Sequence, residues 1–408
     1  MITVDKNIDW QLSPTSIAEK NWDVVIIGAG PAGAIAAIHL AAANHNVLLL
    51  DKEEFPREKI CGDGLLPDTM RCLDTVGLGQ VVRELGFVMH KVSLFSPSRI
   101  NVEVPGTYIT LQRNKLDTLV ARRAVEAGAV FACGKVDQIV VETDESVSFT
   151  IRKNEEKYKA RIAIVATGAN VGLIKKSGGF TAKPASGFAM RCYVQSSFDL
   201  DHMVTWSAKD IIPGYAWIFP MGNHKYNMGC CVVHKYVANP PKNLKKVYHH
   251  FINEFPPARK LMQSGTNARP LRGAALRGNF EGVYPCNKGP VIVIGESIGT
   301  TLPFLGEGIG KAMESGQLAA EIVHTALVSG DIKKLSAFGE RLSNEFKPRY
   351  RAYQIAQAWI AKARVADFFF RRAQKSNYMT DMFSGMVAET HRPTDIFSIK
   401  GIIKSFLK

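Results

Sequence analysis

The chain has 408 residues, of which 46% are hydrophobic and 22% are charged. This composition excludes a disordered or coiled-coil protein and is typical of a globular one, long enough for two joined domains. The net charge of +14 suits nucleic acid, a membrane surface or anionic ligands. No helix-turn-helix, zinc-finger or RNA-binding signature accompanies it, so we expect no nucleic-acid partner. The seven cysteines include no C-x-x-C pair and the ten histidines no metal-binding spacing, so we predict neither a disulfide framework nor a metal site.

The first 21 residues are polar and carry Asp5, Asp9 and Glu19, which predicts neither a signal peptide nor a transit peptide. The most apolar stretch, residues 24–43, is long enough to span a membrane. Its three glycines, Pro31 and His39 indicate a strand, a turn and a helix instead. We therefore expect a cytoplasmic protein.

The strongest local pattern is VVIIGAGPAG at residues 24–33, followed by the helix-forming AIAAIHLAAA. Gly28, Gly30 and Gly33 have the G-x-G-x-x-G spacing between a buried strand and a helix. In this pattern Gly28 makes the tight turn, Gly30 admits a pyrophosphate to the backbone, and Gly33 lets helix and strand pack closely. A second strand, residues 47–50, ends at Asp51, whose carboxylate can bind a ribose hydroxyl. The pattern predicts a dinucleotide site at the helix N-terminus.

The rest of the chain alternates between segments typical of a parallel α/β domain and segments typical of an antiparallel sheet. Before residue 186 the pattern predicts a loop with Gly62 and Gly64, short strands near residues 90–113, a helix from Asn114 and a strand ending in Gly168. Strand-like segments then predict an antiparallel domain, and a parallel-type strand at 290–294 leads to a helix that opens at closely spaced glycines. The region after residue 330 reads as helical and basic, with Pro348 and Pro393 as breaks.

The C-terminal segment IFSIKGIIKSFLK leaves two interpretations open. It is either a helix that covers the catalytic domain, or an interfacial helix that rests on an anionic membrane surface. An apolar row recurs at helical spacing beside a row of lysines: Ile396, Ile399, Ile403 and Leu407, with Lys400, Lys404 and Lys408.

Six motifs in this order resemble the flavin-dependent geranylgeranyl reductase family, whose fold is shared with p-hydroxybenzoate hydroxylase and the flavin halogenases. They are GAGPAG, KICGDGL, the Arg113 segment, ATG, GYAWIFP and PFLGEGIGKAMESG, and they cover most of residues 23–320. The resemblance implies an α/β fold (α+β overall), with a Rossmann-type FAD-binding domain, an interleaved antiparallel substrate domain and a helical C-terminus. The implied boundaries are 22–97, 110–185 and 286–330 for the FAD domain, 98–109 and 186–285 for the substrate domain, and 331–408 for the C-terminal region.

The resemblance also implies a bound FAD and an apolar isoprenoid substrate whose C=C bonds are reduced. Ala32 and the neighbouring glycines would meet the pyrophosphate, and Asp51 the adenosine ribose. Gly308 and Ile309 would face the flavin pyrimidine edge, where negative charge grows on reduction. The remaining cofactor-binding residues implied by the family are Cys61, Gly62, Gly64, Arg113, Val136, Gly168 and Glu296.

Three of these positions suggest catalytic roles. Cys61 matches the family's C-G-x-G element, where a thiol kept protonated by burial could donate a proton or shape the pocket. Tyr215 and Trp217 match Y-x-W-x-F-P and alternate along a strand, so both point to one face. They form either strand core or an aromatic wall that guides an apolar chain.

One position departs from the family, which has Gly-Asp after the late strand where this chain has Gly295-Glu296. Glutamate keeps the charge but is one methylene longer, so the contact with the ribityl chain of FAD must shift or be lost.

Other activities compete with the reductase. An FAD-dependent hydroxylase of the same fold stays open, whereas a halogenase would need tryptophan at position 215 and its own lysine motif. Gly295-Glu296-Ser297-Ile298-Gly299 also spells the G-x-S-x-G of serine hydrolases, but Thr300-Thr301-Leu302-Pro303 follows where a helix is required. The acid and base would have to be residues such as Asp381 and His391. No second strand–G-x-G-x-x-G–helix unit is present, so the electron donor stays open between NADPH and ferredoxin.

Overall fold

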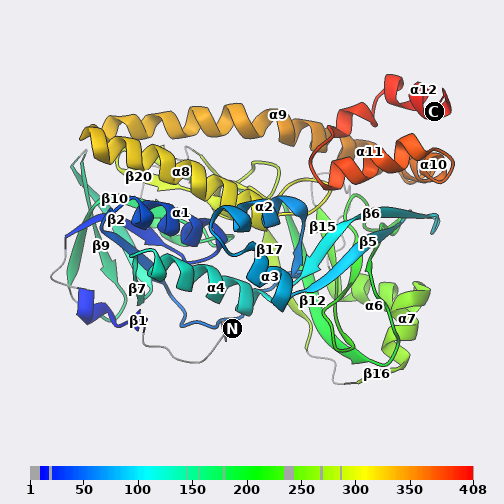
Figure 1. The fold of residues 1–408 in the computed structure, drawn as a ribbon, viewed down its shortest axis with the longest axis horizontal. Helices are drawn as coiled ribbons and strands as arrows, with labels where there is room; N and C mark the ends of the chain where they lie inside the picture. The colour runs from blue at the N-terminus through cyan, green and yellow to red at the C-terminus, as the bar shows by residue number, and fades with distance from the viewer. Residues whose placement is uncertain are drawn as a thin grey trace.

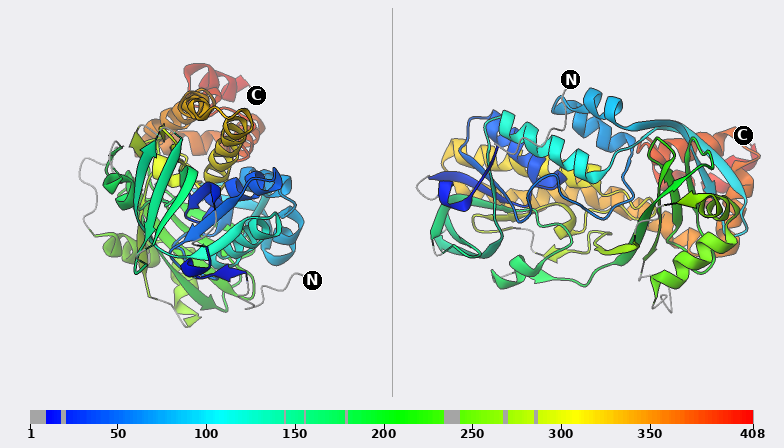
Figure 2. Two further views of the ribbon diagram at one scale, coloured as in Figure 1. Left: turned by 90° about the vertical axis from the view of Figure 1, so that its left-hand side faces the viewer. Right: turned by 90° about the horizontal axis from the view of Figure 1, so that it is seen from below.

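The structure is a computed structural model that describes residues 10–17, 21–143, 145–154, 156–177, 180–233, 243–266, 270–284 and 287–407. It confirms the predicted fold class. Two large sheets lie side by side along the long axis of the molecule, and long helices run along one side of it (Figures 1 and 2). The C-terminus lies at the end occupied by the second sheet (Figure 1).

The first sheet has a parallel centre with three added antiparallel strands. Its central pairs, β2–β3, β3–β7, β2–β10 and β10–β20, are all parallel. The residues of β2 and β3 are almost all buried, as expected for a parallel sheet covered on both faces. The order is β1 (Gln11–Leu12), β7 (Val130–Cys133), β3 (Val47–Asp51), β2 (Trp22–Ile27), β10 (Lys157–Val165), β20 (Val291–Val293) and β19 (Asn287–Lys288). In addition, β9 (Ser146–Ile151) pairs with β10, and β8 (Val136–Thr143) pairs with β9.

Three helices position the ends of these strands. α1 (Pro31–Ala42) packs against both α4 (Arg113–Glu126) and α8 (Ile309–Ser329). α1 and α8 approach closely because Gly316 carries no side chain: a Cβ there would lie 2.2 Å from the Ala32 carbonyl oxygen. This contact ties the first nucleotide-binding helix to a helix almost 280 residues later in the chain.

The second sheet is antiparallel except for the parallel pair β5–β13. The helices α6 (Leu244–Glu254) and α7 (Pro256–Gln263) form a separate core with it. Its order is β16 (Gly265–Thr266), β12 (Gly187–Ser196), β15 (Lys225–Val233), β14 (Ala216–Pro220), β13 (Met203–Trp206), β5 (Phe87–Phe95), β6 (Asn101–Thr110) and β4 (Gly64–Leu65), with β17 (Arg272–Leu276) beside β12. The strand β5 belongs to this sheet, although the sequence prediction assigns residues 22–97 to the FAD domain; the domain boundaries themselves stay a prediction.

The smaller elements connect these layers: α2 (Pro67–Thr75), α3 (Gly79–Leu85), α5 (Gly172–Lys176), β11 (Thr181–Ala182), β18 (Val283–Tyr284) and the 3-10 turns η1 (Pro14–Ile17) and η3 (Gly295–Ile298).

The C-terminal region is helical, as expected. It comprises η4 (Ile332–Ser336), α9 (Ala337–Ile360), α10 (Ala363–Ala373), α11 (Asn377–Val387), η5 (Pro393–Asp395) and α12 (Ile399–Leu407). The predicted break at Pro348 is wrong, because α9 continues through it. Proline removes one backbone hydrogen bond, and the flanking Phe346 and Tyr350, both buried, hold the helix in place. Within the described residues, no helix is long and apolar enough to cross a membrane.

Candidate functional site

A cavity of about 680 Å³ opens along the carboxyl ends of the parallel strands and continues to the second sheet. It brings together almost every residue singled out from the sequence. Those that line it are Gly28, Gly30, Ala32, Asp51, Cys61, Gly62, Gly64, Arg113, Val136, Gly168, Tyr215, Trp217, Glu296, Gly308 and Ile309. Gly33 lies behind the wall, where a Cβ would stand 2.0 Å from the Gly28 carbonyl oxygen, so it serves the packing of helix on strand.

The turn after β2 has the shape that a pyrophosphate requires. Gly28 has a φ of +108°, and a Cβ there would lie 2.3 Å from the Ala166 carbonyl oxygen. At Gly30 the space is open, the nearest atom to such a Cβ being an Arg57 nitrogen at 3.7 Å. The turn therefore needs one glycine for its backbone and another for the room beside it.

Four charged residues form a buried group at this end of the cavity, which we call the arginine cluster: Asp51, Arg57, Arg113 and Asp117. Arg113 donates from Nε and Nη2 to the two carboxylate oxygens of Asp117 at 2.7 and 2.8 Å. Arg57 donates to Asp117 at 2.9 Å and lies 3.4 Å from Asp51. Burial alone would lower the pKa of Arg113, but the Asp117 carboxylate more than offsets this and holds the pKa above its usual value. The arginine cluster thus presents fixed cations to an anionic ligand.

Asp51 occupies the position expected of a ribose-binding carboxylate. One of its oxygens accepts from the Ala29 N–H at 3.0 Å and the other from the Glu53 N–H at 3.1 Å. These bonds tie the end of β3 to the glycine turn.

The N-terminus of α8 forms the opposite wall. The Glu307 side chain accepts from the N–H groups of Gly310 at 2.7 Å and Lys311 at 3.3 Å. Among the described residues, the N–H groups of Gly308 and Ile309 find no acceptor. They are therefore available, with the positive end of the helix dipole, to a ligand in the cavity.

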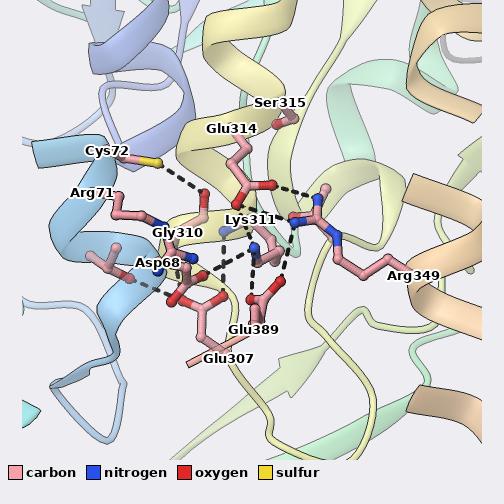
Figure 3. Close-up of polar contacts among 12 residues, drawn as sticks. Asp68, Arg71, Cys72, Glu307, Gly310, Lys311, Glu314, Ser315, Arg349 and Glu389 are labelled. Atoms are coloured by element: carbon pink, nitrogen blue, oxygen red, sulfur yellow. Dashed lines mark hydrogen bonds and ion pairs between the residues drawn. The ribbon is translucent and has the colours of Figure 1, made fainter. Parts of the chain in front are cut away.

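Behind this helix start lies a second buried group, the α8 cluster: Asp68, Glu307, Lys311, Glu314, Arg349 and Glu389 (Figure 3). Lys311 is fully buried and pairs with Asp68 at 3.2 Å, with Glu389 at 2.8 Å and with Glu314. Arg349 pairs with Glu314 at 2.6 Å and Glu389 at 3.1 Å. Burial, reinforced by Asp68, raises the pKa of Glu307 well above its usual value, and burial likewise raises that of Glu389. No local sequence pattern indicates this cluster, because its members are spread from residue 68 to residue 389.

The loop that carries Cys61 is held by a residue that sequence reasoning missed. Asp63 is fully buried, has a φ of +63°, and accepts from Tyr193 at 2.5 Å and from Asn227 at 2.9 Å. Asn227 also donates to the Cys61 carbonyl at 2.8 Å and accepts from the Trp217 indole at 3.0 Å. An aspartate between two glycines at a turn was the available signal. The network fixes the backbone of Cys61 to the second sheet.

Cys61 lines the cavity. Burial raises its pKa, and the nearby Arg113 guanidinium opposes the shift only in part. The thiol therefore keeps its proton at neutral pH, as a proton donor must.

Tyr215 and Trp217 point to the same face, with ring centroids 6.1 Å apart, and Phe219 continues the row another 6.1 Å on. A Cβ at Gly62 would lie 3.2 Å from the Phe219 ring, and one at Gly306 only 2.7 Å from the Tyr215 hydroxyl. The aromatic row thus packs directly on the two glycine loops that face the cavity. Phe219 was not among the predicted site residues, although it belongs to the same sequence motif.

Glu296 reaches the cavity from η3 with few partners. Its oxygens lie 3.4 Å from the Arg277 N–H and 3.8 Å from the Lys59 ammonium. The adjacent Ser297 is fully buried, and its hydroxyl donates to the Gly168 carbonyl at 2.8 Å. His391 is exposed beside Thr390, so the geometry offers no hydrolase triad with Ser297 within the described part of the chain. That same part contains no group of three histidine, cysteine or acidic residues arranged to hold a metal ion.

The fold and the cavity define a dinucleotide-binding flavoprotein, and the comparisons agree. The FAD binding domain family matches residues 21–324. Menaquinone reductase of Mycobacterium tuberculosis is 31% identical over 74% of this chain and 76% of its own length. Digeranylgeranylglycerophospholipid reductase 1 of Methanosphaera stadtmanae is 28% identical over 80% of each chain.

Two solved structures share the fold. A geranylgeranyl bacteriochlorophyll reductase-like protein of Thermoplasma acidophilum superposes with a TM-score of 0.74 at 21% identity, covering 95% of this chain and 96% of its own. The flavin-dependent brominase Bmp2 gives 0.75 at 21% identity, with 95% and 99% coverage. The chain belongs to the FAD binding domain family and is an FAD-dependent oxidoreductase similar to geranylgeranyl reductases.

The residues present fit FAD. The open turn at Gly30 and the arginine cluster suit a pyrophosphate. The unpaired N–H groups at the start of α8 suit the pyrimidine edge of a flavin. Glu296 lines the same cavity, and its carboxylate has few protein partners.

Proposed function

We propose that this oxidoreductase saturates C=C bonds of a geranylgeranyl or longer polyprenyl chain carried by a lipid, a quinone or a pigment precursor. The observation that carries the proposal is the row Tyr215, Trp217 and Phe219, which forms one wall of the cofactor cavity. Aromatic side chains offer an apolar chain a large contact surface. The relatives named above supply both substrate classes, a quinone and a glycerophospholipid.

Reduction of an alkene needs a hydride on one carbon and a proton on the other. When bound, reduced FAD supplies the hydride. The Cys61 thiol supplies the proton in our proposal, because it lines the cavity and its raised pKa keeps it protonated. The resulting thiolate regains a proton from water, and NADPH or a ferredoxin restores the electrons to the flavin.

The aromatic row also positions the chain. Tyr215 is held by its hydroxyl, which donates to the Leu305 carbonyl at 2.8 Å, and Trp217 by its bond to Asn227. Since both polar ends are bonded elsewhere, the rings present only their apolar surfaces to the cavity.

The experiment is an anaerobic single turnover. The FAD-loaded protein is reduced with dithionite and mixed with a geranylgeranyl lipid or with menaquinol, whose ring is already reduced, while flavin absorbance and product mass are followed. We expect flavin reoxidation and a gain of two hydrogens for each bond reduced, with no reaction for the fully saturated analogue. Reoxidation only by O₂ together with an aromatic substrate would instead assign the hydroxylase activity.

The role of Cys61 is tested in the same assay. Cys61→Ser should slow turnover by about 10²-fold or more, the usual contribution of a general acid, while flavin binding persists. Cys133 is a half-buried cysteine at the end of β7, and Cys133→Ser is the matched control that should react at the normal rate. Equal rates for the two variants would remove Cys61 from the mechanism and leave the substrate assignment standing.

A further inference from the structure

The last helix, α12, leaves a row of large apolar side chains in solvent. Ile399, Ile403, Phe406 and Leu407 are 76%, 54%, 61% and 79% exposed. They account for four of the five large apolar side chains that are more than half exposed in the described chain. Their spacing of four, seven and eight residues places them on one face of the helix.

This outward orientation is fixed by the opposite face. Gly401 sits against the end of η5, where a Cβ would lie 2.3 Å from the Asp395 carbonyl oxygen. Ile402 packs on the core, and Arg372 binds the Ser405 carbonyl and lies 3.9 Å above the Phe406 ring. The helix is thus seated on the domain by its small-residue face.

The structure separates the two interpretations of the C-terminal sequence. A covering helix would bury the row Ile396, Ile399, Ile403 and Leu407. Of these only Ile396 is buried, because it precedes α12 and packs in the core, so that part of the predicted row is wrong. The other three face outward together with Phe406.

The charge of this region indicates what covers the face. α12 has no acidic residue, and Lys400 and Lys404 are exposed beside the apolar row; Lys408 lies outside the described residues. Residues 331–408 contain 15 lysines and arginines against 7 acidic residues, a net charge of +8. An apolar face bordered by lysines matches an anionic lipid surface, where acyl chains meet negative head groups.

We propose that α12 is an interfacial helix that seats the protein on an anionic membrane, with its four exposed apolar side chains in the head-group region and its lysines against lipid phosphates. The proposal stands on the helix alone. It does not depend on the proposed reaction, although a substrate carried in a membrane would suit it.

The test is co-sedimentation of the full-length, FAD-loaded protein with vesicles of phosphatidylcholine and phosphatidylglycerol in equal parts, and with phosphatidylcholine alone. We expect binding to the mixed vesicles and far weaker binding to the neutral ones. The double variant Ile403→Glu with Leu407→Glu should lose about tenfold or more in affinity. Lys400→Gln with Lys404→Gln should lose roughly thirtyfold, about fivefold for each lysine.

The matched control is Val328→Glu, on the last turn of α8, where the side chain is 70% exposed; it should bind as the parent does. All variants alter exposed positions, so flavin content and melting temperature should be unchanged. Equal sedimentation of the Ile403/Leu407 variant and the parent would overturn the proposal. So would a concentration-dependent dimer in gel filtration that the same variant abolishes, because a second copy would then cover the face.

Discussion

The arginine cluster and the α8 cluster are both buried beside the cofactor cavity, but they differ in charge balance. The arginine cluster pairs two arginines with two aspartates, whereas the α8 cluster sets Lys311 and Arg349 among four carboxylates. Three members of the arginine cluster line the cavity, and no member of the α8 cluster does. A balanced cluster at the wall can exchange partners with a ligand. In an acid-rich cluster behind the wall, burial favours the protonated form of some carboxyl groups, and the ion pairs hold the packed helices together.

The difference also appears in what each cluster connects. The arginine cluster joins neighbouring parts of the nucleotide domain. The α8 cluster joins α2 through Asp68, α8 through Lys311, α9 through Arg349, and the segment after α11 through Glu389 (Figure 3). It therefore fastens the C-terminal helices to the helix whose N-terminus faces the cavity.

Removing the central cation should give the largest effect. Lys311→Met leaves Asp68, Glu314 and Glu389 with Arg349 as their only cation in the cluster. Breaking a buried pair by removing one partner costs about 3–5 kcal/mol, so we expect this loss in the free energy of unfolding, measured with denaturant.

The control for Lys311 is an exposed ion pair of good geometry. Arg83 and Asp74 bond at 2.7 and 2.8 Å with nearly half of each side chain exposed. Arg83→Met should cost less than about 1 kcal/mol. Similar losses for the two variants would contradict the structural role of the α8 cluster.

In the arginine cluster the larger effect should fall on ligand binding. Arg113→Leu leaves Asp117 paired with Arg57 at 2.9 Å, so the loss of stability should stay well below that of Lys311→Met. A charge-assisted hydrogen bond is worth about 1.5–3 kcal/mol, and FAD affinity should fall at least tenfold by flavin fluorescence titration. If Arg113→Leu left FAD affinity unchanged but greatly lowered the free energy of unfolding, the arginine cluster would be structural and the contrast with the α8 cluster would be wrong.

Glu296 lines the cavity at the position where this chain departs from the family pattern. Glu296→Ala removes a carboxylate with few protein partners, so FAD affinity should fall about tenfold with little change in the melting temperature of the apoprotein. Glu296→Asp, which restores the family residue, should keep affinity within about threefold of the parent. An alanine variant that binds FAD normally would show that the longer side chain has lost the ribityl contact.

The cavity residues were predictable because their signals are local. A few neighbouring residues are enough to predict the geometry of the glycine turn, of Asp51 and of the strand-borne pair Tyr215 and Trp217. The structure brings them to one cavity, as the resemblance implied. Asp63 was missed because nothing local shows that Tyr193 and Asn227, which lie 130 and 164 residues later in the chain, donate hydrogen bonds to it.

Features that depend on tertiary packing could not be predicted in this way. The α8 cluster joins residues up to 321 positions apart in sequence, from Asp68 to Glu389. The spacing of the last helix predicts an apolar face but not which face meets the protein, and the close contact at Gly401 decides it.

A pH-dependent effect is expected from the protons of the α8 cluster. Burial raises the pKa of Glu307 well above its ordinary 4.5, so the folded protein holds a proton there that the unfolded chain releases. The resulting stability is fully present below about pH 4.5 and is lost as pH rises through the raised pKa. Glu307→Gln should flatten this decline by up to about 1.4 kcal/mol per pH unit, measured by denaturant unfolding from about pH 5 to about pH 8.

The control is Glu340, whose carboxylate is exposed on α9. The Glu340→Gln variant should follow the parent curve. Parallel curves for the parent and Glu307→Gln would mean that this carboxyl is already ionised in the fold, and that the cations of the α8 cluster balance more charge than its geometry suggests.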